Sequence, residues 1–330
     1  MILSIESSCD DSSIALTSIV NGALIFEKKI SQITHSHYGG VVPEVAAREH
    51  AKALPLILEE LKPHFLQIKA IAVTHIPGLS LTLLEGVMMA KALCVSLNLP
   101  LIGVNHLYGH MYSLFIGKET ILPQIALLVS GGHTAIFKIR SFDDIVFLGG
   151  SLDDSVGESY DKVAKMLDLG YPGGSVVEEL AKKGDENRFR FPIALQETNA
   201  HKIAFSYSGL KNAVRLQINA SREKDTLQED MEDICASFQK AASTHLEQKV
   251  FKVLSNSSVP NFSIVGGVSN NDYIRSQFAK MCTKLNKQLF TPRKQFCSDN
   301  AAMIGRYALE LYRSEIFTPY QELEVSSRFL

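Results

Sequence analysis

Residues 124–148 read QIALLVSGGHTAIFKIRSFDDIVFL, and this stretch decides the fold. Its alternation of apolar runs and polar turns predicts strands over 124–129, 135–139 and 145–148. The first two strands are joined by the turn SGGHT at 130–134. Backbone N–H groups in such a glycine turn can hold phosphoryl oxygens, so the turn is a candidate phosphate site.

The N-terminal residues repeat the pattern. Short apolar runs predict strands over 2–5, 14–20 and 23–28, and the polar turn ESSCDDSS at 6–13 joins the first two. Hydroxyls and carboxylates packed in one turn suit phosphate or metal binding, although an ordinary solvated hairpin turn has the same composition.

Each copy is followed by long stretches with helical periodicity. A supersecondary unit that returns after about 120 residues indicates a duplicated architecture. We therefore predict an α/β protein with the two-lobed actin-like, sugar-kinase and Hsp70 (ASKHA) fold, in which duplicated βββαβα units surround a nucleotide cleft. The expected lobes are residues 1–120 and 121–330, and a Rossmann fold is excluded because no G-x-G-x-x-G follows a strand.

The composition is that of a soluble enzyme, with 46% hydrophobic and 21% charged residues. With 33 basic and 35 acidic side chains, no overall field attracts nucleic acid, so any RNA contact needs a local patch. The lysines at 280, 284 and 287 are expected to share one helix face and are the best local candidate for contact with RNA. A solvent-exposed helix face without a ligand has the same pattern.

The chain is expected to be cytoplasmic and not to cross a membrane. Its five cysteines are scattered, which favours reduced thiols over a disulfide framework. The N-terminus lacks the basic region of a signal peptide. The longest apolar neighbourhood, residues 79–104, is interrupted by charged residues and a proline.

A histidine pair stands in the sequence GVNHLYGHM at residues 103–111. His106 and His110 are four residues apart, so on a helix they lie on one face and can bind one cation. An apolar run precedes them, and strand-to-helix corners are where open α/β sheets bind ligands. Such a pair also arises by chance, so metal binding and a structural role both remain open at this point. Asp299, from spacing alone, reads as an N-cap of the last helix.

Other candidate nucleotide contacts follow the second copy. Asp161 lies on the helix predicted next and is a candidate partner of a ribose hydroxyl. The sequence YPGG at 171–174 allows close backbone approach to a flat base. The sequence GGVSNN at 266–271 joins a strand to a helix, where Asn271 can pair with a base edge or ribose.

Taken together, these motifs resemble the TsaD family of tRNA N6-adenosine threonylcarbamoyltransferases, formerly labelled glycoproteases, over essentially the whole chain. The resemblance rests on IESSCDD at 5–11, VPEVAAREH at 42–50, PGL at 77–79, NHLYGH at 105–110, LVSGGHT at 128–134, YDK at 160–162, YPGG at 171–174, GGVS at 266–269 and SDN at 298–300.

The resemblance implies roles for particular residues. His106, His110 and Asp299 would be the ligands of one divalent metal ion, Fe2+ or Zn2+, which promotes Asp299 from cap to ligand. The residues implied to bind the adenylate substrate are the phosphate turn Val129, Ser130, Gly131 and Gly132 with Leu128 before it, Asp161 and Glu178 for the ribose, and Gly174 and Asn271 for the adenine end. In the first polar turn, Asp10, with Asp11 beside it, matches a carboxylate that the family needs for activity.

The implied reaction moves the threonylcarbamoyl group from L-threonylcarbamoyl-AMP to N6 of the adenosine 3′ of the tRNA anticodon and releases AMP. The implied partners are tRNA, a TsaB-type paralogue in a heterodimer and a TsaE-type P-loop ATPase. Two alternatives are an ASKHA small-molecule kinase and a non-catalytic TsaB-like scaffold. This chain departs from relatives at Tyr108, where glutamate is usual, at Ile76, where glycine is usual, and at Leu128, where some relatives offer a tyrosine ligand.

Overall fold

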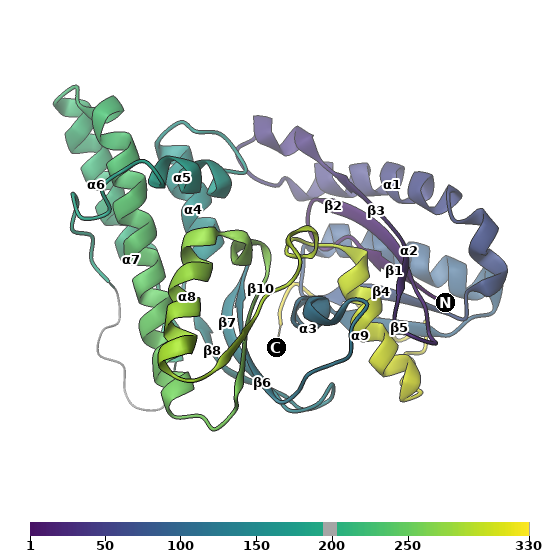
Figure 1. Cartoon of the computed structure of the whole chain (residues 1–330). Coiled ribbons are helices and arrows are strands. Elements are labelled where there is room, and N and C mark those ends of the chain that lie inside the picture. The colour runs from purple at the N-terminus through teal and green to yellow at the C-terminus, as the bar shows by residue number, and fades with distance from the viewer. Residues whose placement is uncertain (194–202, 330) are drawn as a thin grey trace. The chain divides into compact units, whose positions relative to one another are not determined.

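The computed structural model describes residues 1–193 and 203–329, and the chain divides into two compact units (Figure 1). Unit 1 consists of Met1–Ile121 and Pro292–Leu330, and unit 2 of Leu122–Thr291. Each unit is built around one mixed β-sheet.

The sheet of unit 1 has five strands in the order β3-β2-β1-β4-β5. The first three strands pair antiparallel, and β4 and β5 continue from β1 in parallel. The strands are β1 (Ile2–Glu6), β2 (Asp11–Thr17), β3 (Leu24–Ser31), β4 (Ala70–Ile76) and β5 (Leu101–Asn105).

Alternate side chains of the central strand face different helices, as the two-residue period of a strand requires. Leu3 and Ile5 join the apolar cluster that contains side chains of α1 and α2. Ser4 faces the opposite layer, where its hydroxyl donates to the carbonyl of Ala301 in α9 at 2.7 Å. The helices of unit 1 are α1 (Pro43–Glu59), α2 (Ser80–Leu97), α3 (His106–Tyr112) and α9 (Ala301–Arg313), with short 3-10 helices at Ile33–His37, Lys62–Gln67, Ser113–Phe115 and Lys294–Phe296.

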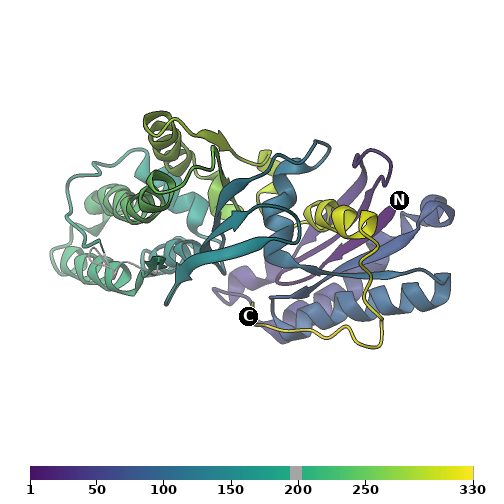
Figure 2. The ribbon, with the colours of Figure 1, turned by 90° about the horizontal axis from the view of Figure 1, so that it is seen from below.

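The C-terminal segment also belongs to unit 1. Figure 2 shows it running from α9 along the unit to the C-terminus. The Thr318 N–H donates to the Leu101 carbonyl at 2.8 Å, and the Ser326 N–H donates to the His75 carbonyl at 3.1 Å. The segment is therefore held along the outer strand β5 and the end of β4.

Unit 2 repeats the strand order of unit 1. Its sheet runs β11-β10-β6-β7-β8-β9, with β6, β7 and β8 antiparallel and β10 and β11 continuing from β6 in parallel. The strands are β6 (Gln124–Val129), β7 (Thr134–Ile139), β8 (Ile145–Ser151), β9 (Ile203–Phe205), β10 (Asn261–Val265) and β11 (Gln288–Phe290). The order β3-β2-β1-β4-β5 thus corresponds to β8-β7-β6-β10-β11.

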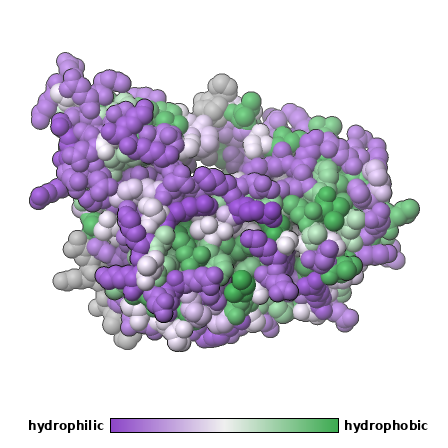
Figure 3. Space-filling view, in the orientation of Figure 1, coloured by the Kyte–Doolittle hydropathy of each residue, from purple (hydrophilic) through white to green (hydrophobic). Residues whose placement is uncertain are grey.

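The helices of unit 2 bury one apolar cluster against this sheet, built from Ile125, Leu127 and Ile264 of the strands and from side chains such as Phe238 and Phe278 of the helices. The surface over α6 and the adjoining end of α7 is mostly hydrophilic (Figure 3). The helices are α4 (Val156–Met166), α5 (Gly174–Ala181), α6 (Ser208–Glu223), α7 (Leu227–Ser255) and α8 (Asp272–Lys284), with a 3-10 helix at Gly267–Asn270.

The predicted duplication of three strands is present, with one copy in each unit. The prediction that residues 121–330 form one lobe is wrong. Residues 292–330 join unit 1, because α9 packs on β1 and β2 so closely that a Cβ at Gly305 would lie 2.4 Å from the Thr17 hydroxyl and 2.8 Å from that of Ser4. Asp299 therefore belongs to the same unit as the histidine pair.

Among the described residues, one helix meets the length and composition of a membrane span, namely α2 (Ser80–Leu97). Its inner side chains, such as Leu83 and Val87, are buried in unit 1. Core helices of soluble proteins can have the same length and composition. In the described part of the chain, Cys9, Cys94, Cys235, Cys282 and Cys297 form no disulfide bond.

Candidate active site

The histidine pair lies at the corner between β5 and α3. Asn105 caps α3, because its side-chain carbonyl accepts the N–H of Leu107 at 2.9 Å, and the helix begins at His106. His106 and His110 consequently stand one turn apart on one face, with ring centroids 4.7 Å apart. Both side chains are buried.

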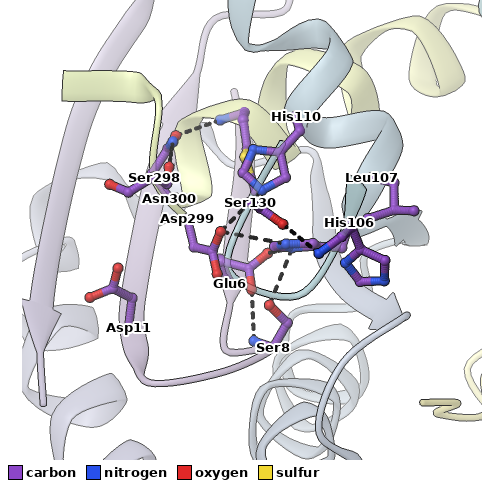
Figure 4. Close-up of polar contacts among 12 residues, drawn as sticks. Glu6, Ser8, Asp11, His106, Leu107, His110, Ser130, Ser298, Asp299 and Asn300 are labelled. Atoms are coloured by element: carbon purple, nitrogen blue, oxygen red, sulfur yellow. Dashed lines mark hydrogen bonds and ion pairs between the residues drawn. The ribbon is translucent and has the colours of Figure 1, made fainter. Parts of the chain in front are cut away.

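Asp299 reaches this pair from the loop before α9. The helix is capped by Asn300, whose side-chain carbonyl accepts the Met303 N–H at 2.8 Å, so the interpretation of Asp299 as the cap is wrong. The Oδ1 atom of Asp299 lies 3.0 Å from His110 Nε2 and 3.5 Å from His106 Nε2 (Figure 4). The close approach of α3 to α9 depends on Gly109, where a Cβ would lie 2.8 Å from Ile304 Cδ1.

The three ligand atoms fit a single metal ion, since all lie within 4.8 Å of one another. Nitrogen and oxygen ligands about 2.1 Å from one ion are separated by roughly 3–3.5 Å when the bond angles are tetrahedral or octahedral. Two imidazoles and a carboxylate also leave coordination positions open for substrate oxygens.

Glu6 forms the second layer of the site and was not singled out by the sequence reasoning. Its Oε2 lies 3.1 Å from His106 Nδ1, on the side of the ring away from Asp299. Glu6 is fully buried, and it accepts the Ser8 N–H at 2.7 Å and the hydroxyl of Thr74. This arrangement fixes the His106 tautomer with a proton on Nδ1 and directs Nε2 toward Asp299.

The electrostatics of the site favour a cation. Burial alone lowers the pKa of His106, but the carboxylates of Glu6 and Asp299 outweigh it and raise that pKa to about 10. Burial opposes ionisation of Asp299, yet His106 holds the pKa of its carboxyl well below the usual range. A buried and a half-buried carboxylate thus favour positive charge, which a divalent ion would supply in place of the imidazolium proton.

The first polar turn supports the loop that carries Asp299. The Lys29 ammonium on β3 donates to Asp11 Oδ2 at 2.9 Å, to Ser298 Oγ at 3.0 Å and to the Asp299 carbonyl at 3.3 Å. Asp11 therefore acts on Lys29 in this structure. Asp10 lies in the same turn, where burial and then the charge of Asp10 raise the pKa of the Cys9 thiol.

In unit 2, the turn after β6 has the features of a phosphate site. Leu128 and Val129 are buried in the strand, and Ser130 Oγ accepts the His133 N–H at 3.0 Å. A Cβ added to Gly131 or Gly132 would meet open space. The start of α4 lies against the turn, because a Cβ at Gly157 would be 2.4 Å from the Ser130 carbonyl oxygen, and helix N-termini favour anions.

The other predicted nucleotide residues hold the backbone around them. Asp161 Oδ1 accepts the N–H groups of Gly173 at 2.8 Å and Gly174 at 3.2 Å. Glu178 Oε1 accepts the Asp272 N–H at 2.8 Å. Asn271 caps α8 through the Ile274 N–H at 2.9 Å and donates from Nδ2 to Gln239 Oε1 at 2.9 Å.

A cavity of about 330 Å³ lies beside these residues in unit 2, a size suited to a small ligand. It is lined by Glu178, Ala181, Lys182, Gly184, Glu186, Ala236, Gln239 and Tyr273. Gln239 and Tyr273 were missed by the sequence reasoning, because they stand on ordinary amphipathic helices without a local motif.

The prediction that Lys280, Lys284 and Lys287 share one helix face is wrong, because α8 ends at Lys284 and Lys287 lies beyond it. Lys287 donates to the carbonyls of Ser257 at 2.6 Å and Val259 at 2.7 Å. Lys284 stands 5.7 Å from the centroid of the Phe251 ring. These interactions give two of the three lysines structural roles.

Sequence comparisons place the chain among known proteins. The family profile described as "TsaD: tRNA N6-adenosine threonylcarbamoyltransferase" matches residues 23–306. Proteins named tRNA N6-adenosine threonylcarbamoyltransferase are 59% identical in a Nitratiruptor species, covering 98% of this chain and 97% of that protein, and 55% identical in Sulfurimonas denitrificans, covering 98% of each. The protein of that name from Helicobacter pylori is 52% identical and covers 100% of this chain and 98% of that protein.

Solved structures confirm the predicted ASKHA fold class. Full-length HypF in its phosphate- and nucleotide-bound form matches with a TM-score of 0.63 at 13% identity, covering 96% of this chain and 56% of that one. The activator of the 2-hydroxyisocaproyl-CoA dehydratase from Clostridium difficile, with bound ADPNP, matches with a TM-score of 0.55 at 13% identity, covering 95% and 96%. The comparisons favour neither the kinase nor the scaffold alternative.

Proposed function

The chain belongs to the TsaD family of tRNA N6-adenosine threonylcarbamoyltransferases, and on this premise we propose how its own residues carry out the transfer. The substrates are L-threonylcarbamoyl-AMP and a tRNA with adenosine 3′ of the anticodon. The bond from adenosine N6 to the carbamoyl carbon forms, the bond from that carbon to the phosphate oxygen breaks, N6 loses a proton and AMP leaves.

The observation that carries the proposal is the convergence of His106, His110 and Asp299 within 4.8 Å in one unit. These residues hold one divalent ion, Fe2+ or Zn2+. When bound, the ion supplies Lewis acidity to oxygens that gain negative charge during the transfer. Glu6 orients His106 and balances the charge of the ion, and Lys29 holds the loop of Asp299.

The adenylate is held by unit 2. Its phosphate binds the N–H groups of the turn Ser130–Gly132, with Leu128 and Val129 as the buried end of the strand that presents this turn. Its ribose and adenine bind at Asp161, Glu178, Gly174 and Asn271, next to the cavity of about 330 Å³. Asp161 also accepts the N–H groups of Gly173 and Gly174. Part of its contribution is therefore to hold the backbone at these two glycines in place.

Asp10 and Asp11 are also assigned to the activity, because both lie in the first polar turn. Asp11 contributes by fixing Lys29, whose ammonium also binds the Asp299 carbonyl. Asp10 supplies a half-buried carboxylate in the same turn. No serine or cysteine nucleophile is needed, because the adenylate is already an activated acyl donor.

The protein works in the cytoplasm with a TsaB-type paralogue and a TsaE-type ATPase. The outer face of α2 supports the heterodimer, because Leu81, Leu84, Met88 and Val95 recur at helical spacing and are 43%, 44%, 56% and 62% exposed. A soluble protein covers such an apolar stripe with a partner. The stripe also explains why α2 has the composition of a membrane span.

The test is a mass-spectrometric assay of threonylcarbamoyladenosine in tRNA. Purified protein is incubated with both partners, threonine, bicarbonate, ATP and unmodified tRNA. Formation of the modified nucleoside that depends on His106 supports the proposal. Phosphorylation of a small molecule without tRNA modification would instead support the kinase alternative.

A further inference from the structure

An open groove in unit 2 has no role in the transfer described above. It runs between residues 188–191, which read RFRF, and helix α6, and it has a volume of about 460 Å³. We call it the RFRF groove. It is lined by Arg188, Phe189, Arg190, Phe191, Ala213, Leu216, Gln217 and Ala220.

One wall of the RFRF groove is aromatic and anchored to α7. The rings of Phe189 and Phe191 are stacked, with centroids 6.3 Å apart and planes inclined by 28°. Arg188 lies over the Phe189 ring and pairs with Asp230 at 3.1 Å and Asp233 at 3.3 Å. These ion pairs hold the segment on the helix, so the aromatic wall is formed before any ligand arrives.

The other wall is one face of α6. Ala213, Leu216, Gln217 and Ala220 follow the spacing of three and four residues that places side chains on one side of a helix. The two alanines leave room, and Leu216 presents an apolar side chain that is 56% exposed. The groove therefore has an apolar interior that water can reach.

The rim of the RFRF groove is positively charged. Arg190, one of the lining residues, is exposed. None of the eight lining residues is acidic. Since the whole chain carries a formal charge of −2, this local positive charge is what an anionic polymer would contact.

We propose that the RFRF groove binds unpaired nucleotides of the tRNA substrate. Bases stack against Phe189 and Phe191, and a backbone phosphate pairs with Arg190. Flat aromatic faces beside guanidinium groups are the chemistry with which proteins bind single-stranded RNA. The inference rests on the proposed function, because that function makes tRNA the substrate.

The experiment measures binding of an unmodified substrate tRNA transcript to the full-length protein with its partners, at salt concentrations from about 50 to 200 mM. The variant Arg190→Ala should weaken binding about fivefold and lower the salt slope by about 1, because this arginine pairs with one phosphate. Phe191→Ala should weaken binding about tenfold with the slope unchanged, because stacking releases no counterions. Arg140→Ala removes the same charge at an exposed position elsewhere and should leave the affinity near wild type.

The readouts separate the groove from the transfer reaction. Binding of threonylcarbamoyl-AMP should stay at its wild-type value in the groove variants. The groove assignment is overturned if the wild type modifies tRNA and the groove variants bind tRNA with unchanged affinity and salt slope. The same holds if the groove variants lose binding of a protein partner while their tRNA affinity is unchanged. If the wild type binds tRNA through the groove but does not modify it, the proposed function fails and the groove assignment stands.

Discussion

His110 Nε2 lies 3.0 Å from Asp299 Oδ1, although 189 residues separate the two in the chain. The contact exists because the chain returns to unit 1 at Pro292 and places α9 on the first sheet. All three candidate metal ligands therefore belong to one unit. Metal binding can be tested apart from nucleotide binding, which is assigned to unit 2.

Replacing Glu6 should loosen the metal without removing a ligand. Glu6→Gln keeps the shape of the side chain but removes the charge that faces His106 Nδ1 at 3.1 Å. We expect metal affinity to fall by about 10- to 100-fold, the usual effect of losing a partner behind a ligand histidine. Titration against a competing chelator measures this, with Glu59→Gln on the exposed side of α1 as the control. Equal affinities in both variants would contradict the role of Glu6.

Lys29 and Lys28 are neighbours on β3 with different partners. Lys29 holds Asp11, Ser298 and the Asp299 carbonyl, whereas Lys28 forms an exposed ion pair with Glu60. Lys29→Met should weaken metal binding by about tenfold, because a half-buried carbonyl and carboxylate lose their donor. Lys28→Met should change it little, since exposed ion pairs contribute about 0–1 kcal/mol. The chelator titration compares the two, and a larger effect of Lys28→Met would refute this account of Lys29.

Two glycine substitutions should separate packing from ligand binding. Gly305→Ala forces a Cβ to within 2.4 Å of the Thr17 hydroxyl and should lower the free energy of unfolding by about 1–3 kcal/mol. Gly131→Ala adds a methyl group to open space and should leave stability unchanged while raising the KM for the adenylate. Urea denaturation and steady-state kinetics measure the two effects. A stability loss confined to Gly131→Ala would contradict both expectations.

His245 should make stability depend on pH. It is buried on α7, and its Nε2 accepts the Ser206 N–H at 3.1 Å. Burial, followed by the charge of Lys249, lowers the pKa of His245 to about 4. The unfolded side chain titrates near its ordinary value of about 6.5, so between these values the unfolded state binds more protons than the folded state. Stability is therefore fully present above about pH 6.5 and decreases as the pH falls toward 4.

The expected contribution of His245 between pH 7 and pH 5 is about 2 kcal/mol. Urea denaturation at the two pH values measures the loss of unfolding free energy in the wild type and in His245→Gln. The variant cannot take up this proton, so its loss should be smaller by that amount. The same loss in both proteins would exclude His245 as the cause.

The sequence was sufficient for features that depend on local pattern. The repeated strand pattern predicted the fold class, and the strands predicted over 124–129, 135–139 and 145–148 correspond to β6, β7 and β8. The spacing of His106 and His110 predicted rings on one helix face, as found. Each of these properties is set by residues close together in the chain.

Features that depend on residues far apart in the chain could not be predicted from local sequence patterns. Spacing made Asp299 a helix cap, because Asn300 beside it has equal capping chemistry and only the tertiary contact with His110 distinguishes them. The return of residues 292–330 to unit 1 leaves no local signal. Glu6 ends an apolar strand and reads as the start of a turn, while its role depends on a histidine one hundred positions later. Only the family resemblance joined Asp299 to the histidines beforehand.

We expect transfer to tRNA to require a divalent ion held by His106, His110 and Asp299. The most direct measurement is the yield of threonylcarbamoyladenosine in tRNA with metal-stripped protein, before and after addition of Fe2+ or Zn2+, for the wild type and for His106→Ala. We expect the stripped wild type to be inactive and to regain activity with metal, and the folded variant to stay inactive under both conditions. Full activity of the stripped wild type, or of His106→Ala, would contradict the claim.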